Sequence, residues 1–181
     1  FAVRLGTAGY GKLYAVDSVR QTITPLIVGV AGNDLPVIDS VLGTEGTRYL
    51  ILLESDTTSV ANLYQQAVDG TVTRLTESET AKSNLSYDAV SGRLAYQETG
   101  TLADGAAWDL IVFSPSSLTR TFVGKGNDPH LVTGGHVLIA YVEDALVAIN
   151  VETQTSSMLM QAPGNPPYAM SADTTKLAIY N

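Results

Sequence analysis

The sequence predicts an all-β protein made of repeated four-stranded antiparallel units, which is the architecture of a β-propeller. Short runs rich in Val, Ile, Leu, Thr and Tyr follow one another along the chain, and these residue types favour strands. No segment keeps a 3.6-residue apolar period with caps, so almost no helix is expected. The same order of strands and turns also recurs four times, which indicates a repeat protein.

The repeat is clearest in one strand of each unit, which carries Leu13, Leu63, Leu110 or Leu146. These leucines are 50, 47 and 36 residues apart. A turn and a second strand follow each of them, and a glycine that accepts positive φ makes residues 69–70 a favourable hairpin turn. Strands are expected at residues 1–5, 12–17, 21–27, 36–41, 49–54, 62–69, 71–76, 85–90, 93–98, 109–114, 118–123, 130–133, 137–143, 145–150, 156–161, 168–171 and 176–180.

A turn containing asparagine precedes the first, innermost strand of each unit. The four predicted turns are Gly32-Asn33-Asp34, Ser83-Asn84, Gly126-Asn127-Asp128 and Gly164-Asn165-Pro166. An ordinary β-sandwich would also give short strands separated by turns. It has no reason to repeat the same order of elements four times, so the propeller is favoured over the sandwich.

The register of the repeat sets the number of blades. It predicts one β-propeller domain over residues 1–181, with complete blades at about 35–77, 84–123 and 129–161. Residues 1–27 and 167–181 would each supply part of a further blade. Two arrangements fit this register: a ring of about five blades in which the termini share one blade, or part of a larger propeller. The closed ring is preferred because an open stack exposes edge strands.

The segment from Asn62 to Glu98 resembles the TolB-type, WD40-like propeller repeat. Leu63-Tyr64 occupies the place of that repeat's Ile-Tyr strand, 69–70 that of its glycine turn, and 74–76 that of its Leu-Thr ending. Residues 171–178 repeat the pattern more weakly, and residues 40–48 lack its turn signature. The resemblance implies a propeller fold. It implies no catalytic residues, because the family shares a repeat pattern and not an active site.

Composition excludes several classes of function. The net charge of −8 argues against general nucleic-acid binding, because an acidic surface repels phosphates. The chain has no cysteine, which removes disulfides, thiol catalysis and cysteine-ligated metals. No apolar run is long enough to cross a bilayer. The abundance of Thr, Ser, Gly and Ala, with few lysines, favours an extracytoplasmic location. The start at Phe1 is expected for a processed protein, an excised fragment or the ordered part of a longer chain.

No catalytic, cofactor-binding or metal-binding constellation is evident. The serine-hydrolase elbow Gly-x-Ser-x-Gly does not occur, and His130 and His136, the only histidines, have no evident third zinc ligand. The glycines at positions 6, 9 and 11 lack the lysine and helix of a nucleotide loop. We therefore expect no enzyme activity, no cofactor and no metal.

Residues at the expected mouth of the central channel are the candidates for binding a ligand. They are Asn33, Asp34, Asn127, Asp128, His130 and Asn165. Asparagine also tolerates turn conformations and bonds its own backbone, so a purely structural role is the expected one for these asparagines. A histidine at a strand start is likewise more often structural than functional.

The loop at residues 99–109 is the other candidate, because it is longer than its equivalents and contains Asp104 and Trp108. Propeller insertions often bind partners, and tryptophan is enriched in binding hot spots. The alternative is that Trp108 packs under its own loop. The favoured function is a non-catalytic interaction or structural module that binds another protein or neighbouring domains of its own chain. The alternative is a ligand-binding or enzymatic propeller acting on a carbohydrate or small polar metabolite.

Overall fold

A computed structural model describes residues 2–5, 12–26, 29–30, 33–55, 58–99, 108–132, 134–171 and 176–179. Strands dominate these residues, and the only helix in these ranges is the 3-10 turn Thr44–Gly46. No helix in the described ranges is long and apolar enough to span a membrane. The chain divides into two compact units, the first including the described residues up to Ser83 and the second those from Asn84 onward.

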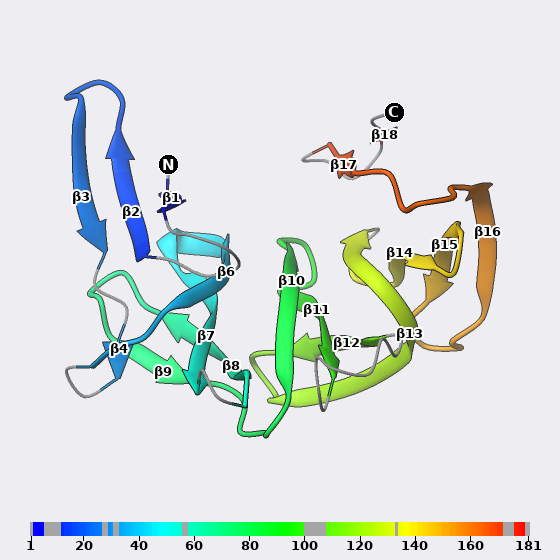
Figure 1. Ribbon diagram of the computed structural model, residues 1–181, viewed down its shortest axis with the longest axis horizontal. Helices are drawn as coiled ribbons and strands as arrows, with labels where there is room; N and C mark the ends of the chain where they lie inside the picture. The colour runs from blue at the N-terminus through cyan, green and yellow to red at the C-terminus, as the bar shows by residue number, and fades with distance from the viewer. Residues whose placement is uncertain are drawn as a thin grey trace. The chain divides into compact units, whose positions relative to one another are not determined.

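The first unit contains three antiparallel sheets (Figure 1). The largest has four strands in chain order, which is the form of one blade. Its strands are β6 (Val37–Leu42), β7 (Arg48–Ser55), β8 (Val60–Gln66) and β9 (Val72–Arg74). A three-stranded sheet of β1 (Ala2–Leu5), β2 (Lys12–Asp17) and β3 (Thr22–Leu26) precedes it, as does the short pair β4 (Gly29–Val30) and β5 (Asn33–Asp34).

The central strand β7 shows why this sheet forms a core. Leu50, Ile51 and Leu52 are consecutive and fully buried, so both faces of the strand are covered. A strand that is buried on both faces has a continuous apolar run instead of alternation. Leu50 and Leu52 pack in one cluster with Val37 and Tyr64.

A seven-stranded sheet in chain order begins with the last residues of the first unit and continues through the second. It consists of two blades joined by one shared strand. Its strands are β10 (Ala81–Asp88), β11 (Arg93–Thr99), β12 (Trp108–Ser114), β13 (Thr119–Val132), β14 (Val137–Val142), β15 (Ala145–Asn150) and β16 (Ser156–Gln161). The first part of β13 pairs with β12 up to Gly126, and its second part pairs with β14 from Asn127. Figure 1 shows β13 as one long bent strand that passes between the two blades.

The predicted turns at 83–84 and 126–128 are wrong as turns, because both segments lie inside the continuous strands β10 and β13. Asn84 and Asp128 each have φ of 54°, in the left-handed region that Asn and Asp tolerate better than most residues. The register of β13 with β14 shifts between Asn127 and His130. A single left-handed residue with a bulge therefore bends the strand without ending it, whereas Asn165, with φ of 49°, lies in a true turn.

The chain's last described strands, β17 (Tyr168–Met170) and β18 (Leu177–Ile179), pair with each other. Tyr168 belongs to a buried cluster of the second unit that also contains Ile139, Tyr141 and Leu146. β1–β3 belong to the first unit and β17–β18 to the second. The blade predicted to be shared by the two termini therefore stays a prediction, as does the single domain over residues 1–181.

Candidate functional site

The outer strand β16 is the most exposed strand of the second unit. It lies at the end of the sheet order, and among the described residues its neighbour in the sheet is β15. All six of its residues are exposed. An outer strand presents backbone N–H and C=O groups that a further strand can bind, so β16 is a template for strand addition.

Apolar side chains occupy the centre of this strand. Met158, Leu159 and Met160 are 60%, 49% and 40% exposed. Three neighbouring large apolar residues on one outer strand differ from the scattered single ones that are normal on protein surfaces. Methionine also packs adaptably against varied partners. The chemistry of β16 is therefore suited to an apolar partner strand.

The neighbouring strand β15 pairs with β16 along its length. The pairing of β15 with β16 aligns Leu146 with Met160 and Val147 with Met158, and the register skips Leu159. Leu159 is thus the extra residue of a β-bulge, which increases the local twist of the strand. Leu146 and Val147 are themselves buried, so the strand that pairs with β16 belongs to the core.

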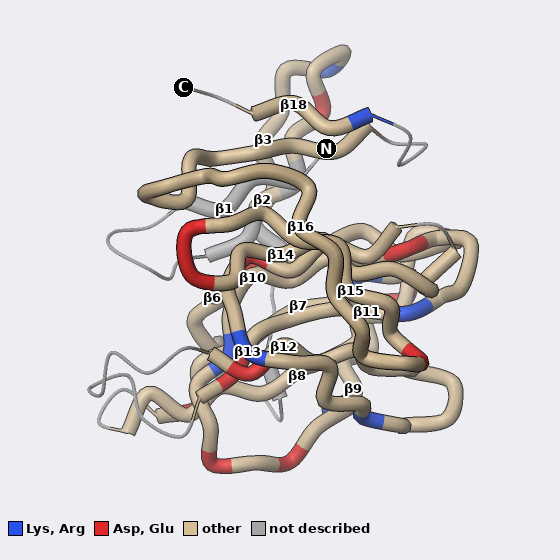
Figure 2. Tube along the Cα trace, turned by 90° about the vertical axis from the view of Figure 1, so that its right-hand side faces the viewer, with Lys and Arg blue, Asp and Glu red and all other residues tan. Residues whose placement is uncertain are grey.

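Charge is found only beyond the two ends of β16. The strand itself has no ionisable residue, and Figure 2 draws it in tan, the colour of residues other than Lys, Arg, Asp and Glu. At the C-terminal end the exposed turn residues Glu143 and Asp144 lie close by, because the N–H of Ala162 donates to the carbonyl of Asp144 at 2.7 Å. At the N-terminal end, Glu152 lies in the turn before the strand.

That turn is anchored by a small polar cluster. His136 Nδ1 lies 3.0 Å from Glu152 Oε1, and Arg93 Nη1 lies 3.7 Å from the same oxygen. The hydrogen bond with His136 is the main reason why the pKa of the Glu152 carboxyl is lowered. His136 therefore helps to hold the β15–β16 turn in place.

Two of the predicted channel-mouth residues come together in the second unit. The Tyr168 hydroxyl donates to the carbonyl of Asp128 at 2.6 Å and lies 3.2 Å from His130 Nδ1. The rings of Tyr168 and His130 are 5.1 Å apart. Burial raises the pKa of Tyr168, with smaller contributions from Asp128 and Tyr141. Tyr168 therefore stays protonated and fastens β17 to β13.

A second bridge involves the backbone at the same bend. The Gln97 side-chain oxygen accepts from Asn84 Nδ2 at 3.2 Å and from the Asp128 N–H at 2.8 Å. Gln97 is buried. The bends of β10 and β13 are thereby joined through one amide. The hydrogen bonds of His130 and of the Asp128 backbone therefore connect β13 to β11 and to β17.

The other predicted binding residues do not join this group. Trp108 begins β12 opposite Gly126 and is half-buried. Asn127 lies in β13 opposite Tyr141, and the N–H of Asn165 donates to Ala162 within its own turn at 3.1 Å. Asn33 and Asp34 form β5 in the first unit, and Asp104 lies outside the described residues. Their roles in binding stay predictions.

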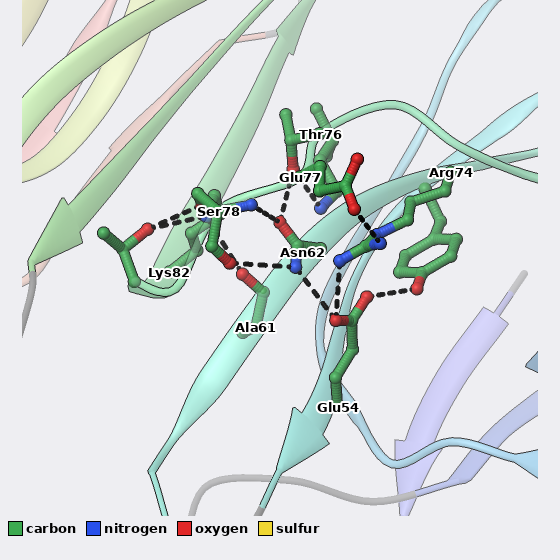
Figure 3. Close-up of polar contacts among 11 residues, drawn as sticks. Glu54, Ala61, Asn62, Arg74, Thr76, Glu77, Ser78 and Lys82 are labelled. Atoms are coloured by element: carbon green, nitrogen blue, oxygen red, sulfur yellow. Dashed lines mark hydrogen bonds and ion pairs between the residues drawn. The ribbon is translucent and has the colours of Figure 1, made fainter.

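The first unit contains a dense polar cluster, shown in Figure 3. The fully buried Asn62 donates to Glu54 and to the carbonyl of Ser78, and its oxygen accepts from Thr76 and from the N–H of Ser78. These four bonds use the whole capacity of an amide side chain. The cluster therefore fixes the segment after β9 against β8.

Two charged groups complete this cluster. Glu54 accepts from Arg74 at 2.8 Å and from the hydroxyl of Tyr64. Burial is the main reason why the pKa of Tyr64 is raised, and the bond to Glu54 adds to the shift. Lys82 is buried and donates to the carbonyl of Ala61 at 3.0 Å. The cluster's polar atoms thus bond to one another, as a structural network requires.

The sequence predicted the strand at 156–161 but not the exposure of its apolar side chains. Met158, Leu159 and Met160 look like core residues, because three adjacent apolar residues usually indicate burial. A usable signal was present: this run ends a four-stranded repeat, so it occupies the outer position. An uncharged apolar run in an outer strand is the pattern of an exposed edge.

Comparison with known proteins identifies the fold but no close relative. No family model matches the chain, and no curated protein matches its sequence. TolB from Acinetobacter baumannii aligns over 98% of this chain, with 12% identity and a TM-score of 0.70. The chain has a TolB-like β-propeller fold. The resemblance predicted from Asn62–Glu98 is thereby confirmed for the fold.

Two enzymes have similar structures. A gluconolactonase from Xanthomonas campestris aligns over 93% of this chain with 12% identity and a TM-score of 0.68. An oligogalacturonate lyase in complex with manganese aligns over 93%, with 13% identity and a TM-score of 0.69. This chain spans 63% of the gluconolactonase, 45% of TolB and 52% of the lyase. Enzymes and TolB thus share the fold.

Proposed function

We propose that this chain is a non-catalytic β-propeller that acts as a protein–protein interaction module outside the cytoplasm. The observation that carries the proposal is the outer strand β16, where Met158, Leu159 and Met160 are exposed together. Strand addition to an exposed edge is a common mode of protein recognition, in which backbone bonds supply affinity and side-chain contacts supply specificity.

The inner-strand residues support this choice over a ligand-binding propeller. His130 and Asp128 meet at the Tyr168 hydroxyl, and Gln97 joins Asp128 to Asn84. These groups bond to one another, which is what a structural role requires. A site for a carbohydrate or a small metabolite needs convergent polar groups directed at the ligand. The ligand-binding propeller remains the alternative function.

The location rests on composition. The chain has no cysteine and only 10 Lys plus Arg against 18 Asp plus Glu. An acidic, lysine-poor chain of this kind suits an extracytoplasmic protein that does not bind nucleic acid. The partners that we propose are another protein or neighbouring domains of the same chain.

The test compares two lysine substitutions in the second unit. Leu159→Lys places a charge at the centre of β16, whereas Val90→Lys places one in the β10–β11 turn, where Val90 is 85% exposed. Proteins from the source cells that bind the wild-type chain are identified, purified and measured by calorimetry. We expect Leu159→Lys to weaken binding at least about tenfold, or about 1.4 kcal/mol, and Val90→Lys to leave it unchanged.

Circular dichroism of both variants verifies that each is folded. The proposal is overturned if every purified partner binds the two variants equally, or if no purified protein binds the wild-type chain. Turnover of a sugar lactone or an oligogalacturonide by the wild-type chain, abolished by His130→Ala, would support the alternative function instead.

A further inference from the structure

The sequence of β16 reads alike in both directions around Leu159. Met158 and Met160 flank it on either side, and the uncharged polar residues Ser157 and Gln161 lie beyond them. A pattern of this kind is self-complementary, because reversing the strand leaves the order of polar and apolar side chains unchanged. A two-fold symmetric interface needs this property, since the same patch contributes both of its sides.

We propose that β16 pairs antiparallel with β16 of a second copy of this chain, about a two-fold axis at Leu159. This inference rests on the proposed function, because it names the partner of the same edge. Leu159 then lies opposite its own counterpart, Met158 opposite Met160, and Ser157 opposite Gln161. The antiparallel order of β14, β15 and β16 continues across the axis into the second copy.

The electrostatics of the edge fit this pairing. β16 has no charged residue, so no like charges meet along the paired strands. The exposed acidic turn at 143–144 lies beyond the C-terminal end of β16. In the two-fold arrangement it comes next to the residues before the other copy's β16, which are the uncharged Gln154 and Thr155. The nearest acid beyond them, Glu152, contacts His136 and Arg93 of its own copy.

The bulge and the net charge set the strength of the association. A bulge twists an edge and weakens further pairing. Because Leu159 is the bulged residue in both copies, the association is expected to be weak and reversible. The net charge of −8 makes the two copies repel each other at long range. Salt screens that repulsion, with a Debye length of about 10 Å at 0.1 M. The dimer is therefore expected to be stronger at 0.5 M salt than at 0.05 M.

The absence of cysteine from the chain allows a test of both the dimer and its register. Directly opposed residues in an antiparallel pair have Cα atoms about 4.5–5.5 Å apart, which is within disulfide range. Leu159→Cys is therefore expected to form a disulfide dimer in oxidised glutathione. Ser157→Cys is expected to stay monomeric, because its own counterpart lies four residues, or about 13 Å, along the strand.

A mixture supplies the second measurement of register. Chains carrying Met158→Cys, mixed with differently tagged chains carrying Met160→Cys, are expected to form mainly the mixed disulfide. Val90→Cys measures random collision, and we expect its disulfide to form at least about tenfold more slowly than that of Leu159→Cys. Sedimentation equilibrium is expected to show a reversible dimer for wild type and a monomer for Leu159→Lys.

Two outcomes overturn the inference. One is a wild-type chain that sediments as a monomer at all salt concentrations, and the other is equal cross-linking through Leu159→Cys, Ser157→Cys and Val90→Cys. If either occurs while purified partners still bind wild type and not Leu159→Lys, only the self-pairing fails and the proposed function stands. If the dimer forms and no other protein depends on β16, self-association is the function of this edge.

Discussion

The outer strands β9 and β16 occupy the same position in their sheets but have opposite surfaces. β9 has three residues, and its Arg74 pairs with Glu54 at 2.8 Å and with Glu77 at 3.5 Å. β16 has six residues, none of them charged, with an apolar centre. Short length, charge and bulges each limit further pairing at an edge, and of these three β16 has only the bulge at Leu159. The edge formed by β9 is thus protected against pairing with a further strand, whereas the edge formed by β16 is available for it.

The segments that follow the two strands extend the contrast. After β9 the chain continues alongside β8, where Leu75 N–H donates to Leu63 and Ala61 N–H to Thr80. Asn62 then holds this segment through its side chain. After β16 the chain leaves the edge in a turn at Gly164-Asn165. Whether an outer edge is closed therefore depends on the segment after it as much as on the strand.

The largest effect is expected from removing the amide that closes the first edge. Asn62→Leu deletes four hydrogen bonds of a fully buried amide and leaves the partly buried polar groups of Glu54, Thr76 and Ser78 without this partner. A buried polar group left unsatisfied costs about 1–3 kcal/mol, so we expect a loss of about 3 kcal/mol in the free energy of unfolding. Urea denaturation followed by circular dichroism measures it.

The matched control on the open edge is Ser157→Leu, which changes an exposed polar residue to the same side chain. We expect its free energy of unfolding to stay within about 0.5 kcal/mol of wild type. Equal destabilisation by the two substitutions would contradict the contrast between a closed and an open edge.

The sheet that leads to β16 depends on close backbone packing at the bend of β13. A Cβ added at Gly126 would lie 2.3 Å from the carbonyl oxygen of Tyr141, so Gly126→Ala must push β13 away from β14. We expect a loss of about 2 kcal/mol. At Gly124 the nearest atom would be 4.0 Å away, and Gly124→Ala is expected to be nearly neutral in the same urea denaturation measurement.

The strands could be predicted from sequence because their signals are local. Apolar runs, β-branched residues and glycine turns place β2 at its observed bounds and most other strands within a few residues. The sequence predicts turns where β10 and β13 only bend, because an Asn or Asp at positions 84 and 128 indicates only that a left-handed conformation is tolerated there. Whether the strand ends there depends on pairing with neighbouring strands, which no local signal encodes.

The candidate site was harder to predict for a related reason. His130 and Asp128 were singled out as polar residues at a strand start, and they do come together, but at the hydroxyl of Tyr168. Tyr168 lies about 40 residues away in sequence, so no spacing rule connects them. The apolar centre of β16 was missed because composition gives hydrophobicity, whereas exposure follows from the strand's place in the sheet.

Arg74→Met tests whether charge alone closes the first edge. The substitution removes a pair between partly exposed groups, and such pairs contribute about 1 kcal/mol or less. We expect a loss of that size in urea denaturation. In a Leu159→Lys background we also expect the variant to sediment as a monomer, because β9 stays short and the segment after it stays anchored. A new dimer would mean that Arg74 alone prevents pairing.

The smallest effect is expected at the polar anchor of the β15–β16 turn. His136 lowers the pKa of Glu152 in the folded chain, so folding favours the ionised carboxylate. This stabilisation is present above the ordinary pKa of 4.5 and is lost as the pH falls through the lower, folded value. The urea midpoint of wild type should therefore fall slightly more between pH 6 and pH 3 than that of Glu152→Gln.

Because the contact between His136 and Glu152 acts as a pair, His136→Ala should reduce the pH dependence of wild type but add nothing to that of Glu152→Gln. A pH dependence unchanged in Glu152→Gln would mean that the contact with His136 does not stabilise the turn, which is then held by its other hydrogen bonds, including those to the Asn150 side chain.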